Sequence, residues 1–389
     1  MFDYLNAYVI PIEIENVDEY YSLIHEISHS DTSKIFVGSL SHSAHINLLI
    51  KEISILLTNS LRLYEMGYFD NAYYSLRSAN ELATVMLDLS DKEDSEIQNN
   101  FEDFRKGKYN KWRSTILNEL SDNGIVFKEV IDKMPNFKKD IRDLLKELNN
   151  VVHSNGRENF YCFRFHTFDE NIHYKKLEEF KKHFLDSIKI LAIMRLIVDP
   201  FPLLLTEEEL YYRCPPIMVH PFSDKMLSVI GQKSIDEFKK TSTYKSTENW
   251  ILSYEKQNIA VNEFLNYDFI NLDKIDDIYS QKHLIPETKL KILDLCYCTN
   301  KIVEIIYGNG IYHFFTSLTK DGYNCNIFDL EELIKINEDY NISYNEIYVS
   351  IMNIGENIEF EFNNLIYIFH EEKLEGNEIK CIEDIINNF

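Results

Sequence analysis

Glycine and proline are both scarce in this chain, which contains 11 glycines and 8 prolines among its 389 residues. This scarcity favours helices joined by short loops, because these two residues are the strongest interruptions of regular structure. No apolar run approaches the roughly 18 residues that a membrane-spanning helix needs, which argues against an integral membrane protein. The first 16 residues carry three acidic and no basic side chains, so a secretory signal is not expected there.

Cysteine is also rare, and its spacing indicates no metal site. The six cysteines are scattered along the chain. Even Cys296 and Cys298, taken with His313 or Cys325, lack the spacing of a zinc site. We therefore expect reduced thiols in a cytoplasmic protein, and no cofactor.

Basic residues are outnumbered by acidic ones, 40 to 64, so the formal net charge is −24. Such a chain is a poor nonspecific nucleic-acid binder, because the phosphate backbone requires a positive surface. Residues 101–200 are the exception, with 19 basic and 16 acidic side chains, and any RNA is expected to bind there. Residues 301–389 carry a charge of −12, which favours a basic protein partner.

Hydrophobic periodicity predicts a mainly α-helical protein with a smaller C-terminal α+β domain. Apolar residues recur at three- and four-residue spacing, as on one face of a helix. The segments with this pattern are 17–29, 45–64, 71–89, 109–122, 136–154 and 174–198. Short apolar runs, some of them bounded by Gly and Asn turns, predict strands. These runs are 7–15, 301–307, 311–316, 347–352, 358–362 and 365–369.

The same patterns predict four parts along the chain. Their first firm boundary is the proline-rich junction at residues 199–202, because proline disfavours helix in the residue before it. The expected parts are a strand and short helix in 1–44, a helical bundle in 45–200, a helical middle region in 201–300 and an acidic α+β domain in 301–389.

The helix predicted to end near Ser154 carries a polar band beside its apolar stripe. The band consists of Arg142, Lys146, Asn149 and His153, which lie within roughly 60° at about 100° per residue. Such a band lies at the edge of a helix–helix contact, where a cleft can form. His153 could then serve as a base or acid beside a cation that holds a phosphate. Alternatively, His153 only caps the helix end and the band is solvated.

Three stretches of this region resemble the HEPN superfamily of helical-bundle proteins, many of which are metal-independent ribonucleases of defence and toxin systems. They are the long helix from His45, the stretch 74–82 and the stretch 147–153. The resemblance covers about residues 45–198. It implies an RNA substrate and a homodimer with a shared cleft.

The catalytic signature of that family is an arginine, usually followed by a polar residue, and then a histidine after four to six intervening residues. His153 matches the histidine and Asn149 the polar residue, but no arginine occupies the expected position. Lys146 or Arg142 on the same helix could supply the cation, and so could Arg77 on an earlier helix. Arg77 and Asn150 are accordingly substrate-binding candidates. The helical spacing of Arg77 and Glu81 also predicts a simple ion pair.

A competing motif lies near the N-terminus. His25-Glu26-Ile27-Ser28-His29 has H-E-x-x-H spacing, which on a helix places two imidazoles where they can share a zinc ion, with Glu26 activating its water. This pattern predicts a zinc metallopeptidase, although the extended motif is absent and chance occurrence on an exposed helix explains it more simply. The third alternative is a non-enzymatic adaptor that binds protein through its acidic C-terminal domain.

The interpretation that the sequence favours is an RNA-handling defence or stress-response protein. It is either a metal-independent endoribonuclease that uses His153 or a non-catalytic HEPN-like relative.

Overall fold

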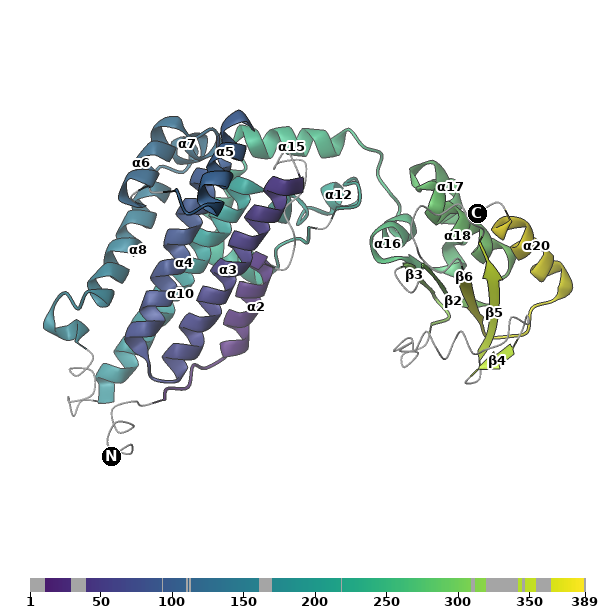
Figure 1. Ribbon diagram of the computed structural model, residues 1–389, viewed down its shortest axis with the longest axis horizontal. Coiled ribbons are helices and arrows are strands. Elements are labelled where there is room, and N and C mark those ends of the chain that lie inside the picture. Colours follow the sequence, from purple (N-terminus) through teal and green to yellow (C-terminus); the bar gives the residue numbers. More distant parts are fainter. Residues whose placement is uncertain are drawn as a thin grey trace. The chain divides into compact units, whose positions relative to one another are not determined.

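The computed structural model divides the chain into two compact units, unit 1 from Met1 to Tyr254 and unit 2 from Glu255 to Phe389 (Figure 1). Each unit has its own hydrophobic core. The structure describes residues 11–28, 40–92, 94–109, 111, 113–160, 170–217, 219–308, 312–319, 342–344, 347–354 and 365–387.

Unit 1 is a helical bundle in which the long helices α3, α4, α8 and α10 run side by side (Figure 1). Its helices are α2 Val17–Ser28, α3 Leu40–Glu65, α4 Phe69–Ser90, α5 Asp94–Arg105, α6 Arg113–Asn123, α7 Val126–Lys133, α8 Phe137–Val152, η1 Arg157–Asn159, α10 Glu170–Val198, α11 Phe201–Leu204, α12 Glu208–Tyr211, α13 Asp224–Ile230, α14 Gln232–Phe238 and α15 Ser242–Leu252. These bounds confirm the helices that periodicity predicts between residues 17 and 198.

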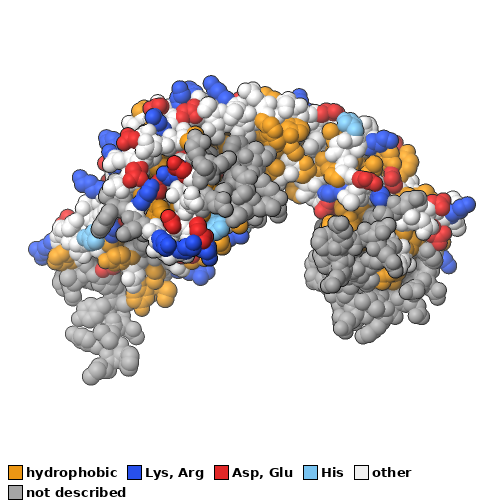
Figure 2. Space-filling model, turned by 45° about the horizontal axis from the view of Figure 1, so that its top comes forward, with side chains coloured by type: hydrophobic (Ala, Val, Ile, Leu, Met, Phe, Trp, Pro, Cys, Tyr) orange, Lys and Arg blue, Asp and Glu red, His pale blue; other side chains and the backbone are white. Residues whose placement is uncertain are grey.

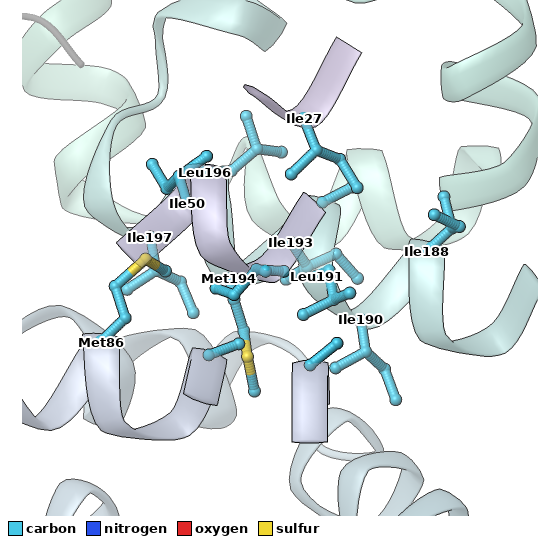
Figure 3. Close-up of a cluster of buried hydrophobic side chains, with 14 of the residues drawn as sticks. Ile27, Ile50, Met86, Ile188, Ile190, Leu191, Ile193, Met194, Leu196 and Ile197 are labelled. Atoms are coloured by element: carbon cyan, nitrogen blue, oxygen red, sulfur yellow. The ribbon is translucent and has the colours of Figure 1, made fainter. Parts of the chain in front are cut away.

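Helix α4 is the centre of the bundle and contacts α3, α6, α8 and α10. The apolar stripes expected on α3 and α4 are buried, because the two helices face each other along their length. Figure 3 shows where α10 closes this core: Ile193 and Met194 meet Ile50 of α3 and Met86 of α4. Each fully buried side chain of this size contributes about 1.5–3 kcal/mol to folding.

The proline-rich junction after α10 does not separate two domains, contrary to the predicted boundary. Proline ends α10 at Val198, as expected. The chain then turns back into the same core, where Phe201, Leu203 and Leu204 are buried. The Asp199 carboxylate accepts the Phe201 N–H at 3.1 Å and so fixes the turn. Unit 1 therefore extends about 50 residues further than the predicted bundle, to Tyr254.

Unit 2 is an α+β domain with a six-stranded sheet in the order β1-β3-β2-β6-β5-β4. The pairs are antiparallel except β1 with β3, which is parallel. Its strands are β1 Phe269–Ile270, β2 Ile302–Tyr307, β3 Tyr312–Thr316, β4 Ile342–Tyr344, β5 Ile347–Asn353 and β6 Leu365–His370. Its helices are α16 Ile259–Tyr267, η2 Leu272–Lys274, α17 Ile275–Ser280, η3 Lys282–Leu284, α18 Glu287–Cys298 and α20 Gly376–Ile386.

The predicted boundary at residue 300 also differs from the structure. Side chains of α16, α17 and α18 pack with those of α20 against one face of β2 and β6, so these helices belong to the sheet domain. Four of the strands predicted between residues 301 and 369 lie in described residues, and the structure confirms all four as strands: β2, β3, β5 and β6. The predicted strand 358–362 lies outside the described residues, as do positions 1–10. Residues 11–15, the described part of the predicted N-terminal strand, form no strand.

The expectation that all cysteines are free thiols is wrong for two of them. Cys298 at the end of α18 and Cys381 in α20 form a disulfide, with Cα atoms 5.9 Å apart. They are 83 positions apart in the sequence, so only the packing of the two helices brings them together. Cys214 and Cys296 are buried free thiols, and Cys162 and Cys325 lie outside the described residues. No helix in the described ranges is long and apolar enough to cross a bilayer.

Candidate functional site

His153 is the C-cap residue of α8 and is held by the hydrogen bonds that end this helix. Ser154 N–H donates to the Val151 carbonyl at 3.1 Å and Asn155 N–H to the Asn150 carbonyl at 2.8 Å, the two bonds of a Schellman motif. The left-handed residue of the motif is Ser154, with φ of 51°, rather than a glycine such as Gly156. The helix end is thus fixed while the His153 side chain stays exposed.

Arg77 of α4 lies against this histidine. Its Nη1 is 3.2 Å from Nε2 of His153, across 76 positions of sequence. Because a guanidinium only donates hydrogen bonds, Nε2 is the acceptor, and the neutral imidazole carries its proton on Nδ1. Arg77 also pairs through Nε with Glu81 at 2.9 Å, one turn further along α4. The structure therefore contains a Glu81–Arg77–His153 chain, which we call the Arg77–His153 site.

The site keeps two groups that can bind a ligand. Within the described part of the chain, neither Nη2 of Arg77 nor Nδ1 of His153 has a hydrogen-bond partner. The Arg77 side chain is 24% exposed and Glu81 is 10% exposed, so the arginine is positioned by a carboxylate that is largely covered. The arrangement offers a directed cation and an imidazole within one hydrogen bond of each other.

Tyr74 joins α4 to the end of α8 next to His153. Its hydroxyl donates to the Val152 carbonyl at 3.3 Å, in the residue before His153. Tyr74 is one turn before Arg77 on α4, and it is 48% exposed. This bond ties the end of α8 to α4 and limits how far His153 can move from Arg77.

The other candidates on α8 are not brought to this site. The Arg142 guanidinium donates to the Asn118 side chain at 2.5 Å, and Lys146 is exposed. The Asn149 Oδ1 atom is buried without a hydrogen-bond partner among the described residues. Asn150 accepts from Asn155 through both its side chain and its backbone carbonyl, so it closes the helix end.

A second histidine lies where α4, α8 and α10 meet, and sequence reasoning missed it. His183 Nε2 lies 3.0 Å from the Glu147 carboxylate, and Tyr73 O–H lies 3.1 Å from Nδ1. Because the carboxylate accepts, Nε2–H donates to Glu147 and the tyrosine donates to Nδ1. Burial lowers the pKa of His183. The sequence signal was the spacing of Phe180, His183 and Phe184, which places this histidine on the buried stripe of α10.

The burial of His183 predicts a pH dependence of stability. A histidine whose pKa is lowered on folding binds fewer protons in the native state than in the unfolded state. Its contribution is therefore complete above about pH 6.5 and declines as pH falls towards the lowered folded pKa, by at most about 1.4 kcal/mol per pH unit. We expect hydrogen-exchange protection of α10 amides, corrected for intrinsic exchange, to fall from pH 7 to 5.5.

The substitution His183→Gln should flatten this pH dependence, because it removes the titrating group. His283→Gln is the matched control, since His283 is exposed and pairs with Glu255 in unit 2. An unchanged slope in His183→Gln would contradict the assignment.

The H-E-x-x-H motif lies on α2 and is only partly described. Both carboxylate oxygens of Glu26 accept hydrogen bonds from Ser223, at 2.8 Å from its N–H and 2.7 Å from its hydroxyl. The glutamate therefore caps the start of α13 instead of facing a metal-bound water. His25 is exposed on α2, and His29 lies outside the described residues. No cluster of three potential metal ligands occurs within the described ranges.

Charges of both signs are interspersed on the face of unit 1 seen in Figure 2. The modest positive charge of residues 101–200 therefore produces no continuous basic surface on that face. Comparisons with protein-family models, with curated proteins and with solved structures find no match. The HEPN resemblance thus stays a prediction.

Proposed function

We propose that unit 1 handles RNA at the Arg77–His153 site and cleaves it without a metal ion. The observation that supports this proposal is the 3.2 Å contact between the Arg77 guanidinium and the His153 imidazole. A cation and an imidazole at hydrogen-bond distance can promote RNA cleavage, because the 2′-hydroxyl of the substrate is itself the nucleophile. Arg77 would take the place of the arginine that α8 lacks.

The chemistry follows from the atoms that the site presents. A phosphate that accepts from Nη1 and Nη2 of Arg77 takes the hydrogen bond away from His153 Nε2. The released Nε2 removes the proton of the 2′-hydroxyl, and O2′ attacks the adjacent phosphorus. The bond from phosphorus to O5′ breaks, and O5′ takes a proton from water or from the second copy of a homodimer. The products are a 2′,3′-cyclic phosphate and a 5′-hydroxyl.

Arginine suits the phosphate role because its planar fork presents paired donors to two phosphate oxygens. Glu81 occupies Nε, which orients the fork and leaves its far edge, Nη1 and Nη2, for the ligand. The Glu81 carboxylate also offsets part of the positive charge of Arg77. Phosphate binding should therefore depend on the orientation of the guanidinium more than on net electrostatic attraction.

The two other interpretations from the sequence gain no supporting observation. The zinc peptidase needs Glu26 as its base, and Ser223 already occupies both oxygens of that side chain. The acidic adaptor depends on the charge of residues 301–389, and many of these lie outside the described residues. A homodimer and a protein partner remain predictions.

The proposal is tested by the salt dependence of RNA binding. We expect Arg77→Ala to weaken binding of a fluorescent single-stranded RNA and to lower the slope of log K against log salt by about 0.7, the value for one lost phosphate contact on a single strand. Fluorescence anisotropy at several salt concentrations measures both quantities.

Arg213→Ala is the matched control. Arg213 pairs with Glu209 at the same i, i+4 spacing and is 26% exposed, close to the 24% of Arg77. Its Nη1 donates to the Tyr254 carbonyl at 2.8 Å, whereas that of Arg77 lies against a histidine. If both variants change the slope equally, or neither does, the RNA site is not at Arg77. If the wild-type protein binds RNA through Arg77 without cleaving it, the protein is a non-catalytic binder.

A further inference from the structure

The disulfide of unit 2 joins two helices at a solvent-accessible position. Cys381 is exposed on α20, whereas Cys298 at the end of α18 is half-buried. Structural disulfides are usually covered, and exposed ones are the more readily exchanged. Cys381 is thus the more accessible of the two residues to a reagent in solution.

A cavity of about 580 Å³ lies beside this bond and includes Cys381 in its wall. Lys291 and Asp294 of α18 and Lys380 and Asp384 of α20 also line it. The cavity is open to solvent and large enough for a small molecule, and its lining includes Cys381 but not Cys298. Its two lysines and two aspartates balance in formal charge.

We propose that Cys381 is a modification site for small-molecule thiols such as glutathione, and that the Cys298–Cys381 bond is a reversible switch that controls α20. The thiolate of the small molecule attacks Sγ of Cys381 from the cavity, the Sγ–Sγ bond breaks, and Cys298 leaves as a thiolate. A second thiolate then attacks the mixed disulfide and releases Cys381. Two small thiols are oxidised to their disulfide and the protein disulfide is reduced to two thiols.

The other described contacts of α20 differ in kind along the helix. Its first turn is held by a capping box between Glu375 and Glu378, and by bonds from Lys301 and Thr299 to Glu378 at 2.9 and 2.7 Å. Beyond Cys381, Ile382 and Ile386 are buried in the core of unit 2 and Ile385 packs against it partly buried. An 11-residue helix is marginal on its own, so reduction should loosen its second half and leave the first turn in place.

Loosening the second half of α20 would change the size of a second cavity. The space of about 320 Å³ between α20 and the strands β5 and β6 is walled on the helix side by Glu383, Ile386 and Asn387. All three come after Cys381 in the chain. The redox state of the disulfide is thereby coupled to the size of this cavity.

The test combines peptide mapping with hydrogen exchange on the full-length protein. After native incubation with reduced glutathione, we expect the mixed disulfide on Cys381 and a free thiol on Cys298. Amide exchange in residues 381–386 should rise by roughly tenfold or more, with a smaller change in 376–379. The double variant Cys298→Ser, Cys381→Ser should show the fast exchange without glutathione. Cys214 and Cys296 are internal controls, because burial raises the pKa of Cys296 to about 12 and keeps it protonated.

Three results would overturn the proposal. The first is a bond that resists glutathione in the folded protein and yields only after unfolding. The second is attachment of glutathione to Cys298 instead of Cys381. The third is exchange in α20 that is the same in the reduced protein, the double variant and the oxidised wild type.

Discussion

Replacing Asp199 by alanine is expected to lower the free energy of unfolding of unit 1 by about 3–5 kcal/mol, the usual cost of removing one partner from a buried ion pair. Asp199 is fully buried and Arg195 is 2% exposed, with Nη1 and Oδ2 3.3 Å apart. The substitution leaves a guanidinium in the core without this carboxylate. It also removes the acceptor of the Phe201 N–H, which fixes the turn after α10.

Chemical denaturation, monitored by a signal that reports on unit 1, measures this loss of unfolding free energy. Two further variants separate its causes. Asp199→Asn keeps an acceptor for the Phe201 N–H and removes only the charge, so it should cost less than alanine. Glu209→Ala breaks an exposed pair of the same i, i+4 spacing with Arg213, and should cost at most about 0.5 kcal/mol. A loss in Asp199→Ala no larger than in Glu209→Ala would show that the buried pair does not stabilise unit 1.

The substitution His153→Ala is expected to reduce the RNA cleavage rate by about 10²–10⁴-fold, the range attributed to a positioned general base. The fold should be unaffected, because the His153 side chain is exposed and the bonds that end α8 are made by its backbone and by those of its neighbours. Single-turnover cleavage of a defined RNA, with circular dichroism to verify folding, measures the effect.

Arg77→Ala should produce a loss of similar size, and the double variant should be little worse than either single variant, because residues that act as a unit are not additive. Arg77→Lys keeps the charge but loses the planar fork, and should recover only part of the rate. The exposed His283 of unit 2 provides the control, since His283→Ala should leave cleavage unchanged. Equal rates for wild type and His153→Ala would remove His153 from the mechanism.

Local patterns predicted the long helices well, because each apolar stripe is set by residues three and four positions apart. They missed α5 and α7, of which α5 lies partly in a polar stretch expected to be a loop. The stripe from Ile46 to Tyr64 on α3 is buried as its spacing predicts. Proline also ends α10 at the expected place. The path of the chain after Pro200 could not be predicted, because continuation of the core depends on Phe201 and Leu204 finding partners from other helices. The same holds for α16–α18, whose apolar faces gave no indication that the later strands would cover them.

At the candidate site, too, features within one helix could be predicted and contacts between helices could not. The position of His153 at a helix end could be inferred from the sequence, and the spacing of Arg77 and Glu81 predicted their ion pair, which is present. Whether Arg77 lies beside His153 depends on the rotation of α4 against α8, and no local pattern determines it. The Glu147–His183 contact joins residues 36 positions apart on different helices, and was missed for the same reason.

The chemistry of the RNA ends tests the central claim most directly. Purified protein is incubated with a defined RNA in excess chelator, and the products are analysed by mass spectrometry. A 2′,3′-cyclic phosphate paired with a 5′-hydroxyl from the wild-type protein, and intact RNA from His153→Ala, is the result that the Arg77–His153 site predicts. Intact RNA with the wild type, or ends carrying a 3′-hydroxyl and a 5′-phosphate, would contradict cleavage at this site.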